Sequence, residues 1–337
     1  MKLMPRVLPI AALAVSVVSC SFFDYSSIAT TRYALVYGVT TYVPSLASNA
    51  YNDPNLSYPH LDAKAVAEML AAKGYKVQSR WVDDQGYAYT NGVKGANVAA
   101  DSSQAPTKGN LEADLASFKG LMGSNDEFVF YFSGHGMQSN DLTVEYFVPY
   151  GAILSETNGS GAQTSTYYYG DTALSVSDTE MGSLLSQNIP TSRKVVILDS
   201  CNSGGFIGRS LDVDISPQST SPYPAPGVTI GTINQAIANY VTYPSGSGAI
   251  SPYNASVLSA SGADESCYDD GDHLHGAMTY YFLQTASQAD FNGDGSVTVR
   301  EAFSFVKAAI ENNWNKTYPD CAFTPHISGG PVDFVLF

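Results

Sequence analysis

The sequence predicts an α/β protein, a three-layer α/β/α sandwich with a mostly parallel central sheet. Apolar runs without polar alternation, such as 33–39 and 195–198, are typical of strands that are buried on both faces. Segments with apolar residues at helical spacing lie between these runs. Such alternation implies right-handed crossovers and helices on both faces of one sheet. The 337 residues are 44% hydrophobic, which is enough for one large core.

The expected elements follow one another along the chain. The first part holds strands at 33–39, 75–82 and 127–132, helices at 61–73 and 111–121, and a Gly-, Asn- and Ser-rich surface loop at 86–106. A Tyr-rich hairpin is expected at 144–172, and Ser177-Asp178-Thr179-Glu180 is a capping box that opens a third helix. The last part holds a long Pro-, Ser-, Thr- and Gly-rich loop at 206–254, strands at 257–260 and 332–337, and helices at 276–289 and 302–312.

The N-terminal segment is predicted to be a signal for export. Lys2 and Arg6 precede an apolar run at 7–18, which ends in small residues. Val17-Val18-Ser19-Cys20 resembles the lipoprotein box of bacteria, which implies that Cys20 becomes the lipidated first residue of the mature chain. The alternatives are an ordinary cleaved signal or an uncleaved anchor. We therefore expect a signal peptide at 1–19, a tether at 20–32, one domain at 33–337, and a periplasmic or cell-surface lipoprotein that meets the membrane only through its lipid.

Charge and cysteine content narrow the classes of partner. A net charge of −15 and a pI near 4.5 exclude nucleic acid, because phosphates require a basic surface. An acidic surface suits cationic partners or calcium, or it serves solubility alone. Cys267 and Cys321 can form a disulfide in an export compartment, or they are two free buried thiols.

One imidazole and one thiol are each predicted at the end of a buried strand. His135 lies in the segment Ser133-Gly134-His135-Gly136, and Cys201 lies in Asp199-Ser200-Cys201-Asn202-Ser203-Gly204-Gly205. The carboxyl ends of parallel strands line the ligand crevice of such sheets, so these side chains can meet there. Together they are the minimum for nucleophilic acyl transfer: Cys201 attacks, and His135 manages the protons of the thiol and the leaving amine. The amides of Gly136 and Cys201 are the natural oxyanion donors. The alternative is a structural cysteine and a core histidine.

These two motifs resemble those of the caspase-fold cysteine peptidases (peptidase C14), most of all the bacterial metacaspase-type branch. Weaker resemblances extend over most of the mature chain, at Tyr33 to Val39, Leu61-Asp62-Ala63, Ser259-Ala260-Ser261 with Glu265, Gly276 to Tyr281, and Thr324-Pro325. The resemblance implies a caspase-like fold, a peptide or protein substrate and no organic cofactor. A monomer is the favoured oligomeric state.

Specificity for a basic residue follows from the position of Asp199. It lies two residues before Cys201, so both point to the same side of the strand, and a carboxylate there favours a cationic substrate side chain. The metacaspase resemblance implies that Asp62, Ser133 and Asp199 line a pocket for Arg or Lys. The Gln-Ala-Cys motif of caspases, which cut after Asp, is absent. The alternative for Asp199 is a structural acceptor at the strand end.

The sequence also bears on self-cleavage. No Lys or Arg occurs from Ser210 to Val299. In the loop at 206–254, which follows Cys201, Arg209 is therefore the one basic residue after which the protein could cut itself. The alternative is a loop that stays intact.

A calcium loop is predicted at 290–301, where twelve residues match an EF-hand loop at each key position. The expected ligands are Asp290, Asn292, Asp294, Ser296 (through its carbonyl), Thr298 and Glu301. Apolar residues at helical spacing flank the loop, so the expected role of calcium is to hold the last two helices. The metacaspase resemblance also implies an activating calcium at a second acidic cluster, Asp269, Asp270 and Asp272, for which a solvated loop is the alternative.

Two rival functions remain open. One is a legumain-, clostripain- or gingipain-like peptidase, which shares the pairing of histidine and cysteine but differs in its pocket. The other is a calcium-binding surface lipoprotein that binds peptides without turnover. The presence of both Cys201 and His135 argues against this second function.

Overall fold

The computed structural model describes residues 30–138, 145–160, 163–202, 255–260, 268–327 and 334–337. The predicted signal peptide, Cys20, the loop 206–254 with Arg209, and Cys267 lie outside these residues. Among the described helices, none combines the length and the apolar character that crossing a membrane requires.

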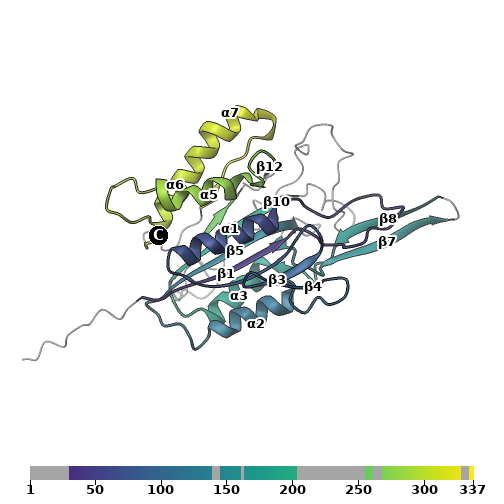
Figure 1. Cartoon of the computed structure of the whole chain (residues 1–337), viewed down its shortest axis with the longest axis horizontal. Coiled ribbons are helices and arrows are strands. Elements are labelled where there is room, and N and C mark those ends of the chain that lie inside the picture. Colours follow the sequence, from purple (N-terminus) through teal and green to yellow (C-terminus); the bar gives the residue numbers. More distant parts are fainter. Residues whose placement is uncertain (1–29, 139–144, 161–162, 203–254, 261–267, 328–333) are drawn as a thin grey trace, which may run out of the picture.

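A twisted sheet forms the centre of the molecule (Figure 1). Its main path runs in the order β14-β11-β10-β5-β1-β2-β3-β4. The five strands from β11 to β2 are parallel to one another, and the strands at the two edges are antiparallel. This confirms the predicted mostly parallel sheet. The bounds are β1 Arg32–Val39, β2 Lys76–Val82, β3 Tyr87–Thr90, β4 Val93–Asn97, β5 Glu127–Gln138, β10 Arg193–Asn202, β11 Ser256–Ser259 and β14 His326–Ile327.

Alternate residues of the central strands feed two separate hydrophobic cores. In β1, Leu35 and Tyr37 belong to one cluster, and Ala34 and Val36 belong to the other. Successive strand residues point to opposite faces, so a strand that is apolar throughout needs a packed layer on each side. The strands are apolar throughout because a hydrophobic core packs against each face of the sheet.

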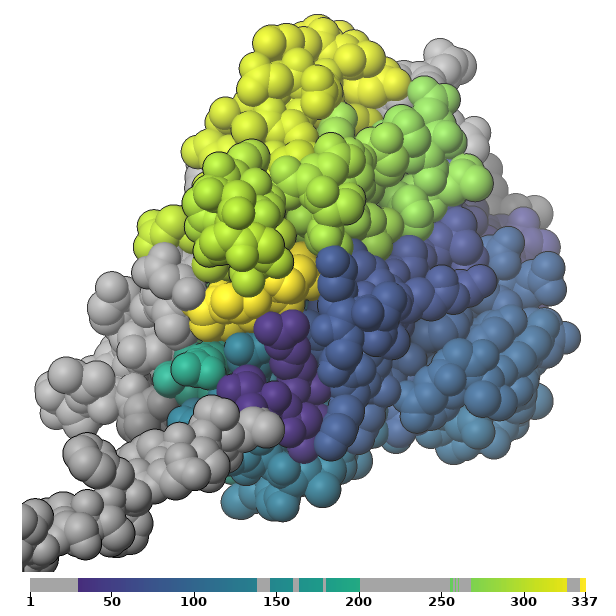
Figure 2. All heavy atoms as spheres, turned by 60° about the vertical axis from the view of Figure 1, so that its left-hand side comes forward, coloured from purple at the N-terminus to yellow at the C-terminus, as the bar shows by residue number. Residues whose placement is uncertain are grey.

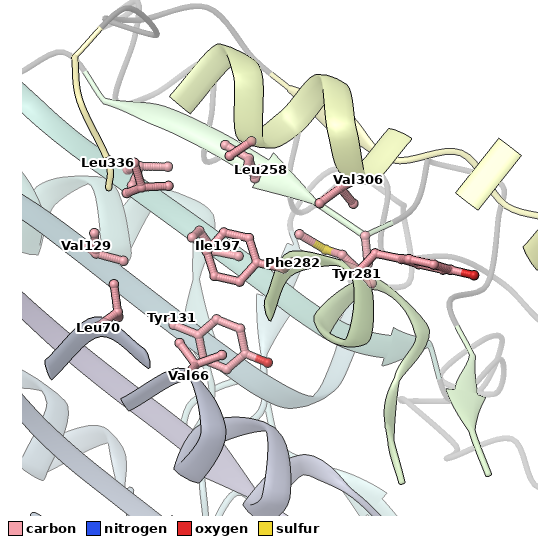
Figure 3. Close-up of a cluster of buried hydrophobic side chains, with 14 of the residues drawn as sticks. Val66, Leu70, Val129, Tyr131, Ile197, Leu258, Tyr281, Phe282, Val306 and Leu336 are labelled. Atoms are coloured by element: carbon pink, nitrogen blue, oxygen red, sulfur yellow. The ribbon is translucent and has the colours of Figure 1, made fainter. Parts of the chain in front are cut away.

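Helices cover both faces and complete the three layers (Figure 1). One core receives buried side chains from α2 (Lys108–Phe118) and α3 (Asp178–Asn188). The other core receives them from α1 (Pro59–Ala72), α5 (Ala277–Gln288) and α6 (Val299–Ala309). Figure 3 shows this second core, where Val66 and Leu70 of α1 face Val129, Ile197 and Phe282. A π-helix at Ile310–Trp314, α7 at Asn315–Thr317 and a 3-10 turn at Pro319–Cys321 follow α6.

The start of each helix follows from local sequence. Pro59 stands in the first turn of α1, where its missing N–H costs nothing. The Ser177 side chain accepts a hydrogen bond from the Glu180 amide and caps α3, which confirms one half of the predicted capping box, while the Glu180 side chain pairs with Lys108. Thr298 and Glu301 form a reciprocal capping box at α6. In Figure 2 the C-terminal part of the chain, green to yellow, packs against the blue N-terminal part, so segments far apart in sequence share one body.

The predicted surface loop at 86–106 is wrong, because β3 and β4 form a hairpin there that extends the sheet. The turn is Asn91-Gly92, with φ of 51° and 77°. Asn-Gly tolerates positive φ at both central positions of a tight hairpin turn, so the signal was present in the sequence.

Other excursions match the prediction in part. The Tyr-rich segment forms a long hairpin of β7 (Ile153–Ser160) and β8 (Gln163–Gly170). The short strands β6 (Glu145–Phe147) and β9 (Val176–Ser177) come before and after it in the sequence and pair with each other. In place of the expected terminal strand, the described residues 334–337 make a single bridge, Thr298 to Val335, and reciprocal backbone bonds between Val297 and Phe337. Cys321 is a free buried thiol, which favours the free-thiol alternative over a disulfide with Cys267.

Candidate active site

The backbones of His135 and Cys201 are direct neighbours in the sheet. Strands β5 and β10 run parallel, and their register pairs Cys201 with His135 and Asn202 with Gly136. β5 extends past His135 to Gln138, and β10 extends past Cys201 to Asn202, whereas the sequence had predicted that both strands end before the active residues. The two residues expected to do chemistry therefore occupy paired ladder positions at the carboxyl ends of neighbouring strands, where parallel sheets form ligand sites.

The His135 ring is buried and held in one tautomer. Its Nε2 lies 2.7 Å from the backbone oxygen of Pro54. A carbonyl oxygen only accepts, so Nε2 carries the proton and donates it, and in the neutral ring Nδ1 is the basic nitrogen. Burial lowers the pKa of His135 to about 4, and the Pro54 carbonyl offsets this only in part. At neutral pH the ring is uncharged and has one nitrogen ready to take a proton.

Tyr42 fixes the position of His135, and the sequence analysis missed it. The Tyr42 hydroxyl accepts a hydrogen bond from the His135 amide at 2.8 Å and donates one to the Val148 oxygen at 2.9 Å. The two rings also pack with centroids 4.8 Å apart. A Cβ at Gly134 would lie 2.7 Å from that hydroxyl, so this close approach requires glycine. These contacts join residues 93 and 106 apart in sequence, which no local pattern indicates.

The three residues predicted to form the substrate pocket come together. The Ser133 hydroxyl donates to Asp62 Oδ2 at 2.9 Å, and Ser133 is the register partner of Asp199. Asp62 and Asp199 are each 1% exposed. Gly38 permits this arrangement, because a Cβ there would lie 2.4 Å from the Pro59 oxygen and push α1 away from β1.

The N-terminus of α5 supplies hydrogen-bond donors to both carboxylates. The Gly276 amide donates to Asp62 at 3.1 and 3.2 Å, and the Thr279 amide donates to Asp199 Oδ2 at 2.9 Å. The Thr279 hydroxyl also donates to Asp199 Oδ2, while it lies 2.5 Å from the Tyr131 hydroxyl. Unsatisfied amides and the helix dipole make a helix N-terminus favourable for negative charge. The sequence indicated the segment 276–281 only through its resemblance to the caspase-fold family, and Thr279 was not identified.

Two buried carboxylates so close together oppose each other's ionisation. Burial raises the pKa of Asp199 to about 7, and the negative charge of Asp62 adds to the shift. Burial also raises the pKa of Asp62, while His275 is the largest of the influences that lower it. His275 Nδ1 lies 2.8 Å from Asp62 Oδ1. Sequence reasoning missed His275, which comes from the short hairpin of β12 (Asp269–Asp270) and β13 (His275–Gly276).

The predicted calcium loop lies between α5 and α6 as expected. Gly293 and Gly295 have φ of 75° and 85°, and Asp290 accepts bonds from the amides of Gly293, Asp294 and Gly295. Glu301, expected as the twelfth-position ligand, accepts from the Thr298 amide at 2.9 Å. The donor set is all oxygen, which suits calcium, but the carboxylates point into the loop and the helix cap. Among the described residues, no group of three or more His, Cys, Asp or Glu is arranged to hold a metal ion.

The second acidic cluster serves its own hairpin. Asp270 accepts from the Asp272 and His273 amides at 3.1 and 3.2 Å and contacts His273 Nδ1 at 2.7 Å. Both Asp270 oxygens are thus used within the hairpin, and Asp270 is buried, which differs from the solvated loop that was the alternative; an activating calcium at this cluster stays a prediction.

Comparison with known proteins gives one family and two solved structures. A sequence profile of the caspase domain (peptidase family C14) matches residues 31–327. The chain is similar to the crystal structure of protein GSU0716 from Geobacter sulfurreducens, at 16% identity and a TM-score of 0.48, over 90% of this chain and 97% of that one. It is also similar to caspase-1 from Spodoptera frugiperda, at 10% identity and a TM-score of 0.44, over 89% and 87%. No curated protein matches the sequence.

Proposed function

The chain belongs to the caspase-domain family of cysteine peptidases, and from this premise we propose an endopeptidase that uses Cys201 and His135 to cleave after arginine or lysine. The observation that carries the proposal is the paired position of these two residues on β10 and β5. The buried pair of carboxylates, Asp62 and Asp199, supports the basic specificity.

The chemistry follows from the state of His135. Its neutral ring presents Nδ1 as the base, because Nε2–H is committed to the Pro54 oxygen. Nδ1 takes the proton of the Cys201 thiol as the sulfur attacks the substrate carbonyl, and the amides of Gly136 and Cys201 stabilise the oxyanion. The imidazolium then protonates the leaving amine, and water hydrolyses the acyl-enzyme by the reverse route. Burial disfavours the imidazolium, so His135 acts as a base during attack instead of holding a permanent thiolate.

Specificity follows from the charge of the pocket. Two carboxylates that are almost fully buried favour a cation that can reach them, and an acidic substrate side chain would be repelled. We propose that Asp199, Asp62 and Ser133 together form the pocket for the residue whose carbonyl is attacked.

A single experiment tests the reaction and its specificity. Peptides that differ only in Arg, Lys or Asp before the scissile bond are assayed with the full chain, with Cys201→Ala and with Cys321→Ala, which removes a free thiol elsewhere. Cleavage after Arg and Lys that is lost only in Cys201→Ala supports the proposal. Activity that survives Cys201→Ala, or fastest cleavage after Asp, contradicts it. Binding of the peptides without turnover would support a non-catalytic protein.

Calcium is proposed to act as a structural ion at 290–301. Backbone bonds from Val297 to Phe337 and Leu336 tie this loop to the end of the chain, so an ordered loop would also order those residues. Bound calcium would supply positive charge for the loop carboxylates and would take no part in a reaction step. We expect added calcium to raise the melting temperature of the natural chain. The melting temperature of the Asp290→Ala variant should stay unchanged when calcium is added. An equal rise in both would contradict the site.

Anchoring and processing are proposals that concern residues outside the described ranges. Lipidation at Cys20 predicts that the full chain partitions with membranes and that Cys20→Ser does not. Self-cleavage at Arg209 predicts two fragments in active protein and one intact chain in Cys201→Ala. Intact loops in an active sample, read by mass spectrometry, would exclude the cleavage.

A further inference from the structure

The carboxylate of Asp62 has no free acceptor site. His275 Nδ1 meets Oδ1 at 2.8 Å, Ser133 donates to Oδ2 at 2.9 Å, and the Gly276 amide contacts both oxygens. A carboxylate offers about four lone-pair positions, and these contacts occupy them. Asp62 is therefore saturated by the protein itself.

Asp199 differs from Asp62 in having one oxygen open. Its Oδ2 accepts from the amide and the hydroxyl of Thr279. Its Oδ1 is buried and has no hydrogen-bond partner among the residues that the structure describes. A buried carboxylate oxygen without a donor is costly, and a cationic ligand would remove that cost. The pocket thus offers one unused oxygen, Asp199 Oδ1.

Three residues donate to Asp62: Ser133, Gly276 and His275. Only His275 donates through a side chain that lies outside the central sheet. Ser133 belongs to β5, and Gly276 bonds through its backbone. The His275 side chain is 20% exposed, while that of Asp62 is 1% exposed. The imidazole therefore lies between solvent and one acceptor position of Asp62 Oδ1, whose other position takes the Gly276 amide.

We propose that His275 determines the choice between lysine and arginine, because it occupies Asp62 Oδ1 and leaves the pocket a single open oxygen. The inference rests on the proposed function and deepens it. Lysine carries a compact point charge that one oxygen can accept. Arginine carries a planar fork whose best partner is a pair of oxygens, and His275 withholds the second. The chain accordingly favours lysine before the scissile bond.

The test compares matched peptides with Lys or Arg at that position. His275→Ala frees one acceptor position of Asp62 Oδ1, and the ratio of kcat/KM for Arg over Lys should rise about tenfold, which equals ~1.4 kcal/mol. His275→Asn keeps a neutral side-chain donor near the place of Nδ1, so its ratio should return toward that of the natural chain. The control is His273→Ala, which removes a histidine–aspartate contact of 2.7 Å in the same hairpin and should leave the ratio unchanged.

Each outcome bears on one level of the account. A purely structural role for His275 would lower both kcat/KM values together, and an unchanged ratio in an active His275→Ala protein would overturn the inference while the proposed function stands. Absence of cleavage after either basic residue in the natural chain would overturn the proposed function itself. If His275→Ala does not fold, the natural chain still decides: a preference for Arg over Lys of more than about tenfold is incompatible with a single open oxygen.

Discussion

His135 and the carboxylate pair of Asp62 and Asp199 lie at the same end of the sheet, yet burial has opposite effects on their charge. At His135 a backbone carbonyl and a tyrosine ring hold a group that burial keeps uncharged. At Asp62 and Asp199, amides at a helix N-terminus and hydroxyl groups hold two acids, and burial opposes their ionisation. The difference teaches that burial at one end of a sheet can keep a histidine neutral and, close by, raise the pKa of two acids.

The largest effect is expected at the base. His135→Ala removes the proton acceptor, and kcat should fall about 10³-fold, within the usual contribution of general acid–base catalysis. KM for basic peptides should change little, because the pocket residues stay in place. Steady-state kinetics with matched peptides measures both values, and a rise in KM without a fall in kcat would show that His135 serves binding instead.

Asp199→Asn should have the next largest effect. It removes the charge at the open oxygen while keeping the shape, and kcat/KM for Lys peptides should fall about 100-fold, the size expected for a buried charge-assisted contact. Asp114→Asn is the control, since Asp114 lies on α2 and pairs with Arg80 of β2 at 2.6 Å. Equal losses in the two variants would mean that Asp199 acts through stability alone.

The dependence on pH tests the charge of the pocket. Asp199 has a pKa of about 7 in the fold against an ordinary value of 3.8, so below pH 7 it becomes protonated and the pocket loses charge. KM for Lys peptides should rise by up to tenfold for each pH unit below 7.

The raised pKa of Asp199 also affects the stability of the fold, and this effect should decrease stability as the pH rises. The folded protein retains a proton that the unfolded chain loses above pH 3.8, so this group's contribution to stability falls as pH rises from about 4 to 7. Asp199→Asn should remove that fall in thermal unfolding. A natural chain whose stability rises steadily over this window, with no difference in the variant, would contradict a raised pKa.

Tyr42→Phe should have the smallest effect. The ring stays against His135, but the His135 amide and the Val148 oxygen lose their shared hydroxyl. We expect kcat to fall about tenfold, the cost of one hydrogen bond that positions a catalytic ring. The Arg-to-Lys ratio should not move, because Tyr42 has no described contact with the pocket carboxylates. A change in that ratio would contradict this expectation and would show that the surroundings of His135 also affect binding at Asp62 and Asp199.

Much of the architecture was predictable because its signals are local. The apolar runs marked strands buried on both faces, and glycines and polar residues at 133–136 and 199–205 marked the end of the sheet where the candidate site lies. The hairpin at Asn91-Gly92 also had a local signal, but the polar composition around it outweighed that signal in the prediction.

The supporting residues of the site could not be found in this way. His275 meets Asp62 across 213 residues, and Thr279 meets Asp199 across 80. Their positions depend on how α5 packs against the end of the sheet, and hydrophobic periodicity does not specify which polar residue arrives there. Only the tertiary fold shows that one carboxylate is already satisfied and the other is not.

The most direct test of the account is covalent trapping of the nucleophile. A peptidyl chloromethyl ketone with Lys at its reactive end should alkylate one thiol with loss of chloride, and mass spectrometry of the digested protein locates the adduct. The account predicts labelling at Cys201 that is strongly slowed in His135→Ala and in Asp199→Asn. Labelling at Cys321 instead of Cys201, or equal rates in the natural chain and both variants, would contradict it.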